Sequence, residues 1–240
     1  MSSRLDLALA EKGLVKSRTS AQSLVRSGKV TVNGKPVEKP SALVEETDVI
    51  EIVGELPRYV GRGGEKLEKA ISCFEIALDG CVCLDVGAST GGFTDCMLQN
   101  GAKQVFAVDV GTNQLDEKLR TDSRVVSLEQ LDIRKAEGKI PAVDFASIDV
   151  SFISLRLILP EIRKFLKKDK TFVALVKPQF EAGKKYLNKN GVVKDKKVQE
   201  KVLEDMCEFA AAQGYTVLGR TDSPIPGGDG NREFLLYLKN

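Results

Sequence analysis

Histidine and tryptophan are both missing from this chain of 240 residues. Without an imidazole, the chain by itself cannot build a Ser-His-Asp triad, a Cys-His nucleophile pair or a histidine-ligated zinc site. Its five cysteines are odd in number, and no two of them form a Cys-x-x-Cys pair. Cysteines of this kind are usually small buried residues of proteins in a reducing compartment. The sequence therefore predicts neither a metal site nor redox chemistry.

Long apolar runs are also missing. No stretch approaches the roughly 18 residues that a membrane-spanning helix needs. The first residues, MSSRLDLALAEKG, lack the uninterrupted apolar core of a secretory leader. Apolar residues make up 42% of the chain and charged residues 29%, which is ordinary globular usage. We therefore expect a soluble cytoplasmic protein without a membrane partner, built from one large domain or from a large and a small one.

The net charge of +2 is small, but the charges are unevenly distributed. Residues 1–40 carry eight basic side chains against three acidic ones, a local charge of +5. Residues 162–201 carry thirteen against four, a local charge of +9. Either block alone would usually be a solvated helix face. Two such blocks together favour a polyanionic partner such as a nucleic acid.

Residues 1–53 have the pattern of a small α+β domain. Alternating leucines from Leu5 to Leu9 predict a first helix, and Ser17-Arg18 stands at the start of a second. Two short β-branched runs flank Asn33-Gly34, which is a strong signal for a hairpin turn. A further strand is expected at 48–53, where apolar and acidic residues alternate.

After a linker at 54–60, residues 61–240 have the pattern of a larger α/β domain. Apolar strands alternate with segments of helix length, as in a parallel sheet that is covered by helices on both faces. We therefore predict a doubly wound, Rossmann-like domain. Its strands are expected at 81–86, 104–109, 124–128, 143–149, 171–177, 215–220 and 233–238.

A glycine-rich loop follows the first of these strands, at Asp85-Val-Gly-Ala-Ser-Thr-Gly-Gly-Phe93. Such a loop lets the backbone approach a ligand, and the helix after it offers free N–H groups. The spacing is the D-x-G-x-S-x-G variant of S-adenosylmethionine-dependent methyltransferases. Asp109 ends the second strand, where a carboxylate accepts hydrogen bonds from ribose hydroxyls, and Asp132 follows the third, facing adenine. An NAD-dependent enzyme fits less well, because the G-x-G-x-x-G spacing is absent.

Four charged residues form the expected reacting group: Lys66, Asp149, Lys177 and Glu233. Asp149 and Lys177 end strands of the predicted sheet, and ligands of such sheets bind beyond these ends. A lysine there can orient a ribose hydroxyl and stabilise the alkoxide that develops during methyl transfer. No Asn/Asp-Pro-Pro-aromatic motif for an exocyclic amine follows the fourth strand, and no cysteine is placed to attack a pyrimidine. Oxygen is therefore the expected acceptor, with surface ion pairs as the alternative role of the four residues.

Together these motifs resemble a known family across essentially the whole chain. Residues 4–40 are similar to the S-four-type RNA-binding module of a ribosomal protein. The segments 61–67, 85–95, 149–155 and 176–181 resemble the TlyA or haemolysin-A-like family, whose catalytic domain is of the FtsJ/RrmJ ribose methyltransferase type.

The resemblance implies 2′-O-methylation of cytidine in ribosomal RNA, with the four charged residues as a catalytic tetrad and Lys177 as its chief lysine. The implied RNA contacts are Arg4, Ser17, Arg18, Arg26, Lys29 and Arg62. The implied S-adenosylmethionine-binding residues are Asp85, Gly87, Ala88, Ser89, Gly91, Gly92, Phe93, Asp109, Val110, Asp132 and Asp149. The family name supplies one alternative, a membrane-active haemolysin, and loss of chemistry supplies another, an RNA-binding protein without catalysis.

Overall fold

The computed structural model describes residues 2–15, 18–54 and 57–240, without the side chains at 19, 20 and 23. Its chain divides into two compact units, residues 1–58 and 59–240, which are called the N-terminal and C-terminal units below. Ser17, which was expected to begin a helix and to contact RNA, and residues 55 and 56 of the expected linker lie outside the described residues.

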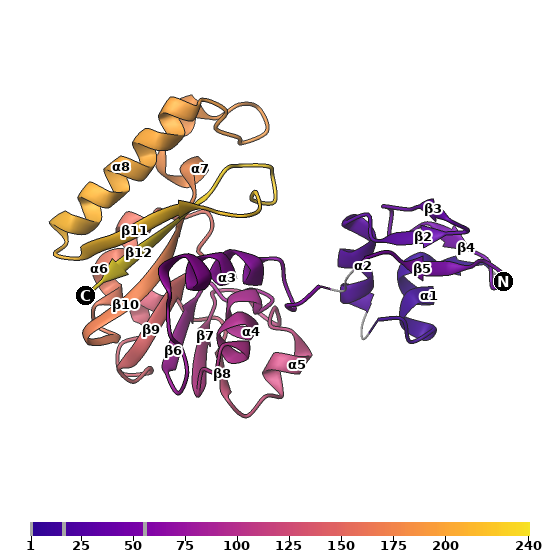
Figure 1. The fold of residues 1–240 in the computed structure, drawn as a ribbon, viewed down its shortest axis with the longest axis horizontal. Coiled ribbons are helices and arrows are strands. Elements are labelled where there is room, and N and C mark those ends of the chain that lie inside the picture. The colour runs from indigo at the N-terminus through magenta and orange to yellow at the C-terminus, as the bar shows by residue number, and fades with distance from the viewer. Residues whose placement is uncertain (1, 16–17, 55–56) are drawn as a thin grey trace. The chain divides into compact units, whose positions relative to one another are not determined.

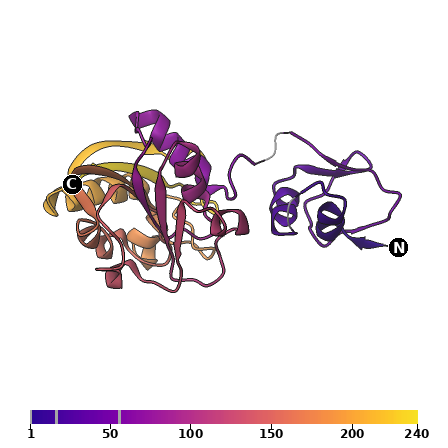
Figure 2. The same cartoon turned by 90° about the horizontal axis from the view of Figure 1, so that it is seen from below.

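The N-terminal unit packs two helices against short strands. Figure 2 shows the two helices side by side. Its elements are β1 (Ser3–Arg4), α1 (Leu5–Glu11), α2 (Arg18–Arg26), β2 (Val30–Val32), β3 (Lys35–Pro36), β4 (Leu43–Val44) and β5 (Ile50–Ile52). The predicted hairpin is confirmed: β2 pairs with β3, and Asn33 and Gly34 both have positive φ, as a tight turn between twisted strands requires. Leu5, Leu9 and Leu24 form the centre of a separate hydrophobic core.

The C-terminal unit is built on a seven-stranded sheet in the order β11-β12-β10-β9-β6-β7-β8 (Figure 1). The strands are β6 (Val82–Val86), β7 (Gln104–Val108), β8 (Val125–Leu128), β9 (Val143–Ile148), β10 (Leu166–Val176), β11 (Thr216–Asp222) and β12 (Phe234–Lys239). The helices are α3 (Gly63–Phe74), α4 (Gly92–Gln99), α5 (Glu117–Arg120), α6 (Leu159–Ile162), α7 (Pro178–Glu181) and α8 (Lys196–Ala212). Short 3₁₀ turns lie at Ile133–Lys135, Leu155–Leu157 and Lys184–Tyr186.

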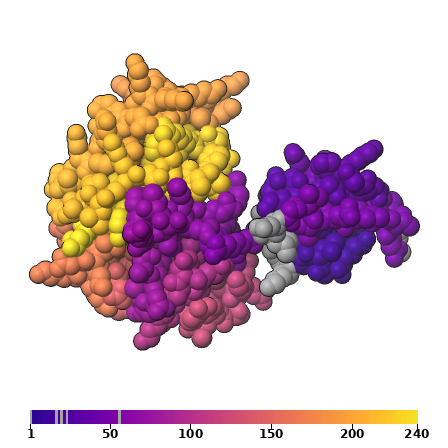
Figure 3. Space-filling view, viewed as in Figure 1, coloured from indigo at the N-terminus to yellow at the C-terminus, as the bar shows by residue number. Residues whose placement is uncertain are grey.

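Alternate residues of each strand point to opposite faces of this sheet, and each face is covered. Leu84 of β6 packs in a core with residues of α6 and α8, whereas the neighbouring Cys83 packs in a second core with Leu67 of α3 and Met97 of α4. The expected doubly wound α/β fold is therefore confirmed. The space-filling view shows the C-terminal strands bordering α3 (Figure 3), where Phe74 stacks on Tyr237 with ring centres 5.1 Å apart.

Two details of the predicted sheet were wrong. The five strands from β6 to β10 are parallel, but β12 runs antiparallel between β10 and β11, because only the loop 223–233 joins β11 to β12 and no helix carries the chain back across the sheet. In addition, β10 begins at Leu166, five residues before the predicted start at Thr171. The polar run 167–170 hid this extension, which has a register shift and a positive φ at Asp169.

Candidate active site

A cavity of about 220 Å³ lies at the carboxyl ends of the parallel strands, above the glycine-rich loop. It is lined by four separate parts of the chain: the start of α3, the loop that joins β6 to α4, the residue after β9, and the loop between β11 and β12. The lining residues are Arg62, Gly63, Lys66, Gly87, Ala88, Ser89, Thr90, Gly92, Phe93, Asp149, Ile225, Pro226 and Gly228. The structure therefore brings Lys66, Asp149 and the glycine-rich loop together around one cavity.

Close packing forces the choice of glycine in this loop. Gly87 has a φ of +85°, and a Cβ atom there would lie 2.3 Å from the backbone oxygen of Asp149. At Gly92, a Cβ atom would lie 2.8 Å from the nitrogen of Gly64 and 2.9 Å from the oxygen of Gly61. The loop is thus pressed between the end of β9 and the segment that leads into α3.

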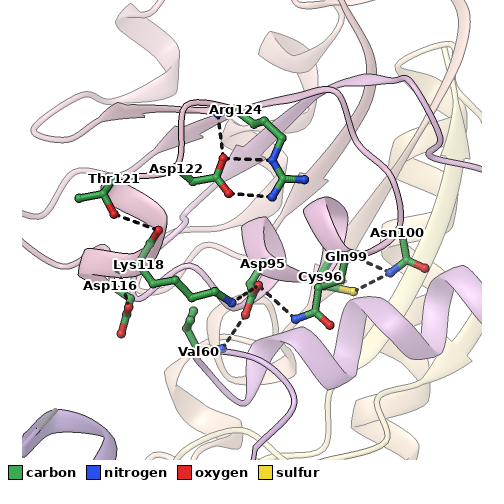
Figure 4. A network of polar contacts seen from close by, with 10 residues as sticks. All are labelled: Val60, Asp95, Cys96, Gln99, Asn100, Asp116, Lys118, Thr121, Asp122 and Arg124. Atoms are coloured by element: carbon green, nitrogen blue, oxygen red, sulfur yellow. Dashed lines mark hydrogen bonds and ion pairs between the residues drawn. The ribbon is translucent and has the colours of Figure 1, made fainter. Parts of the chain in front are cut away.

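Asp95 of α4 holds that leading segment in place (Figure 4). Its buried carboxylate accepts hydrogen bonds from the backbone N–H of Val60 at 3.0 Å, from Lys118 at 3.2 Å and from Gln99 at 3.1 Å. Because Val60 comes two residues before Arg62, this contact positions one wall of the cavity.

Asp85 lies beneath the cavity rather than on its wall. The carboxylate is fully buried and accepts hydrogen bonds from the hydroxyls of Thr94 at 2.7 Å and Ser147 at 3.2 Å. Burial raises the pKa of Asp85 to about 7, although these two hydrogen bonds act in the opposite direction. The residue therefore ties α4 to β6 and β9 and supports the loop from below.

Asp109 and Asp132 follow β7 and β8 at the same edge of the sheet. Asp109 accepts hydrogen bonds from the backbone N–H groups of Ser89 at 2.8 Å and Gly111 at 2.7 Å, so it also braces the glycine-rich loop. Asp132 forms a fork with the guanidinium of Arg134, with a nitrogen–oxygen distance of 2.6 Å, which lowers the pKa of Asp132. The neighbouring Val110 is largely exposed.

The four predicted reacting residues form two buried ion pairs. The Nζ of Lys66 lies 2.5 Å from Oε2 of Glu233, and these side chains are only 10% and 2% exposed. The Nζ of Lys177 lies 2.5 Å from Oδ1 of Asp149, with exposures of 9% and 19%. Lys66 and Asp149 both line the cavity, so the two pairs face the same region. Such pairs can hold a polar substrate group and balance the charge that develops on it.

Sequence reasoning missed several contributors to this site. Ser151 accepts a hydrogen bond from Lys177 at 2.9 Å. Its position two residues after Asp149 was the sequence feature that could have identified it as part of the site. The loop residues Ile225, Pro226 and Gly228 close one side of the cavity, and the Pro-Gly-Gly run was the sign of a tight turn. At Gly227, a Cβ atom would lie 2.4 Å from Oε1 of Glu233, so a larger residue there would displace this carboxylate.

The predicted RNA contacts fall on both units. In the N-terminal unit, Arg4 and Arg18 both bind the buried Asp6, at 2.9 and 3.1 Å. The hydrogen bond from Arg4, supported by those from Gln22 and Arg18, holds the pKa of Asp6 well below its usual range.

The remaining predicted contacts differ in exposure and position. Arg26 is exposed at the end of α2, and Lys29 is half-buried just before β2. Arg62 belongs to the C-terminal unit, where it lines the cavity.

The described residues also bear on metal binding, cysteine chemistry and membrane spanning. No group of three or more cysteine, aspartate or glutamate side chains in that part of the chain is arranged to hold a metal ion. All five cysteines are free, and burial raises the pKa of the Cys83 thiol above its usual value. Within the described ranges, no helix has both the length and the apolar character needed to cross a bilayer.

Comparisons with known proteins agree with this arrangement. The FtsJ-like methyltransferase family matches residues 59–240, and the S4 domain matches residues 3–50. The chain is 49% identical over 238 residues to a putative rRNA methyltransferase, YqxC, of Bacillus subtilis, covering 98% of this chain and 85% of the relative. It is 41% identical over 239 residues to the 16S/23S rRNA (cytidine-2'-O)-methyltransferase TlyA of Mycobacterium tuberculosis, covering 98% and 89%.

Among solved structures, a putative hemolysin from Streptococcus thermophilus superposes with a TM-score of 0.79 at 48% identity, covering 100% of this chain and 88% of the other. The same two-part chain thus occurs in proteins named for rRNA methylation and for haemolysis. By its fold, its motifs and these matches, the chain belongs to the FtsJ-like methyltransferase family and carries an S4 domain ahead of the methyltransferase domain.

Proposed function

We propose that this chain is an S-adenosylmethionine-dependent methyltransferase that methylates the 2′-hydroxyl of cytidine in ribosomal RNA. The observation that carries the proposal is the pair of buried ion pairs, Lys66–Glu233 and Lys177–Asp149, beside a cavity over a glycine-rich loop. The nucleotide and the RNA class come from the relatives that are named for them. Because ribosomal RNA is the substrate, we place the protein in the cytoplasm.

The cofactor-binding role is supported by the shape and the donors of the cavity. Gly87 lines the cavity with its backbone alone, and Ala88, Ser89 and Phe93 line the wall beside it. Asp109 and Asp132 lie at the same edge, where carboxylates meet the ribose and adenine of a nucleoside. When bound, S-adenosylmethionine supplies a methyl group carried on a positively charged sulfur.

The residues of the chain act on the acceptor. Lys177 forms an ion pair with Asp149 and donates a hydrogen bond to Ser151, and an ammonium group with three N–H donors can still donate to a ribose oxygen. An ammonium group in this position orients the 2′-hydroxyl and stabilises the negative charge on its oxygen while the new oxygen–methyl bond forms, and the hydroxyl proton passes to the neighbouring carboxylate of Asp149. Lys66, fixed by Glu233, adds a second positive charge beside the cavity. The two carboxylates prevent an excess of positive charge near the sulfonium of the cofactor.

We propose that a domain at 1–53, joined by a linker at 54–60 to the methyltransferase domain at 61–240, anchors the RNA. Arg4 and Arg18 are held by Asp6 while remaining about half exposed, so their free N–H groups are pre-positioned for phosphate. Arg26 and Lys29 add further positive charge. Phosphate contacts of this kind position an RNA rather than specify its sequence, and they weaken with salt.

The test is transfer of labelled methyl from S-adenosylmethionine to unmodified small subunits, large subunits and their naked RNAs, followed by nucleoside analysis. Label is expected in 2′-O-methylcytidine, and Lys177→Ala is expected to lower the rate at least about 100-fold, as loss of a positioned acid–base group does. Lys103→Ala is the matched control, since that lysine is exposed at the amino end of β7. Label in a modified base would contradict the ribose assignment. No label on any substrate would leave RNA binding without catalysis.

A further inference from the structure

One strongly charged surface has no role in the site described above. Residues 184–197, called the lysine segment here, carry six lysines against one aspartate, a local charge of +5. All six side chains are exposed, and none forms an ion pair with a described residue. The lysines near the other edge of the sheet differ, since Lys164, Lys167 and Lys170 each have a carboxylate partner. The lysine segment therefore keeps its positive charge available for a partner.

The backbone of the lysine segment is held by hydrogen bonds to two asparagine side chains, one of which is buried. The side chain of Asn188 accepts hydrogen bonds from the N–H groups of Asn190 at 2.8 Å and Val192 at 3.0 Å. Asn231, which is 1% exposed, accepts from the N–H of Val193 at 3.0 Å and donates to the oxygen of Gly191 at 3.2 Å. The lysines thus project from a fixed loop, and a fixed loop loses less conformational entropy on binding than a free one.

The lysine segment lies at the edge of the sheet where the reacting residues are. It begins after α7, the short helix that directly follows Lys177, and its anchor Asn231 stands two residues before Glu233. A groove of about 370 Å³ lies between this segment and residues 152–154, which follow Asp149. Gly183, Lys184, Leu187 and Gly191 form one wall of that groove. An RNA strand whose ribose reaches Lys177 therefore passes the lysine segment.

We propose that the lysine segment is a second RNA-contact surface, within the C-terminal unit, that binds the phosphates flanking the target nucleotide. This inference rests on the proposed function and extends it. The N-terminal unit anchors the RNA through its own charges, whereas the lysine segment holds the strand next to the reacting ribose. Unpaired lysines suit this task, because an exposed ammonium group binds phosphate as a point charge without demanding one geometry.

The test compares two triple variants of the full chain. Lys184→Ala/Lys189→Ala/Lys194→Ala removes three charges from the lysine segment. Lys103→Ala/Lys139→Ala/Lys168→Ala removes three exposed lysines that lie in or before the amino ends of β7, β9 and β10. Affinity for transcribed small-subunit and large-subunit RNA is measured by fluorescence anisotropy over a salt series. S-adenosylmethionine binding by calorimetry confirms that each variant keeps its cavity.

The first variant is expected to lower the slope of log affinity against log salt by about 2, at roughly 0.7 for each lost phosphate contact. At 0.1 M salt this amounts to a loss of affinity on the order of 100-fold. The control variant is expected to keep the slope of the unaltered chain. Equal slopes in all three proteins, or equal losses in both variants, would overturn the inference. Absence of methyl transfer by the unaltered chain would instead count against the proposed function and would leave this comparison of slopes intact.

Discussion

Removal of the Lys66 charge gives the sharpest test of the buried pairs. Lys66→Met keeps the length of the side chain but leaves the carboxylate of Glu233, which is 2% exposed, without its partner at 2.5 Å. Breaking a buried pair in this way typically costs about 3–5 kcal/mol, because one charge stays in a poorly hydrated site. At about 2–4 °C per kcal/mol for a domain of this size, the C-terminal unit should melt roughly 6–20 °C lower.

The double variant Lys66→Met/Glu233→Gln separates this electrostatic cost from lost packing. It removes the stranded charge while the amide keeps nearly the shape of the carboxylate beside Gly227. We expect it to recover most of the lost stability in scanning calorimetry but to remain inactive in methyl transfer. The reasoning is refuted if Lys66→Met melts with the unaltered chain, or if the double variant is no more stable than the single one.

Two further predictions concern the support of the cavity. Gly87→Ala should abolish S-adenosylmethionine binding in calorimetry, since its Cβ atom would displace the backbone of Asp149; unchanged affinity would contradict the packing described above. Asp85 has a folded-state pKa of about 7, raised above its ordinary value of 3.8, so its contribution to stability is complete below about pH 3.8 and is lost as pH rises through 7. Asp85→Asn should therefore flatten the fall in melting temperature between pH 5 and 8, and parallel curves for the two proteins would refute this assignment.

The alternation of strands and helices was predictable, because a strand covered on both faces is apolar along its whole length. The direction of β12 was not, since a strand has the same pattern in either direction and only its connection decides. That direction matters at Glu233. The start of a parallel strand would lie at the far edge of the sheet, whereas the start of the antiparallel β12 lies where β9 and β10 end, beside Lys66.

The positions of the strand ends likewise predicted that Asp149 and Lys177 meet. The sequence pattern did not predict the local side-chain contacts around them. The fork between Asp132 and Arg134 and the hydrogen bond from Lys177 to Ser151 depend on rotamers that no periodic pattern specifies. The same holds for Asp85, whose distance from the first glycine matched a cofactor-binding motif, although its side chain points into the core. Sequence spacing places a residue at an edge of the sheet, and packing decides which way its side chain faces.

The position of β12 also sets an order of events during synthesis. This strand lies inside the sheet, between β10 and β11, so β11 has no strand to pair with until the ribosome has made the residues after 233. The N-terminal unit has its own core and needs none of those residues to fold. The N-terminal unit of a nascent chain can thus fold early, while the proposed tetrad stays incomplete until Glu233 has been made. If Glu233 acts as proposed, methyl transfer becomes possible only at the end of translation.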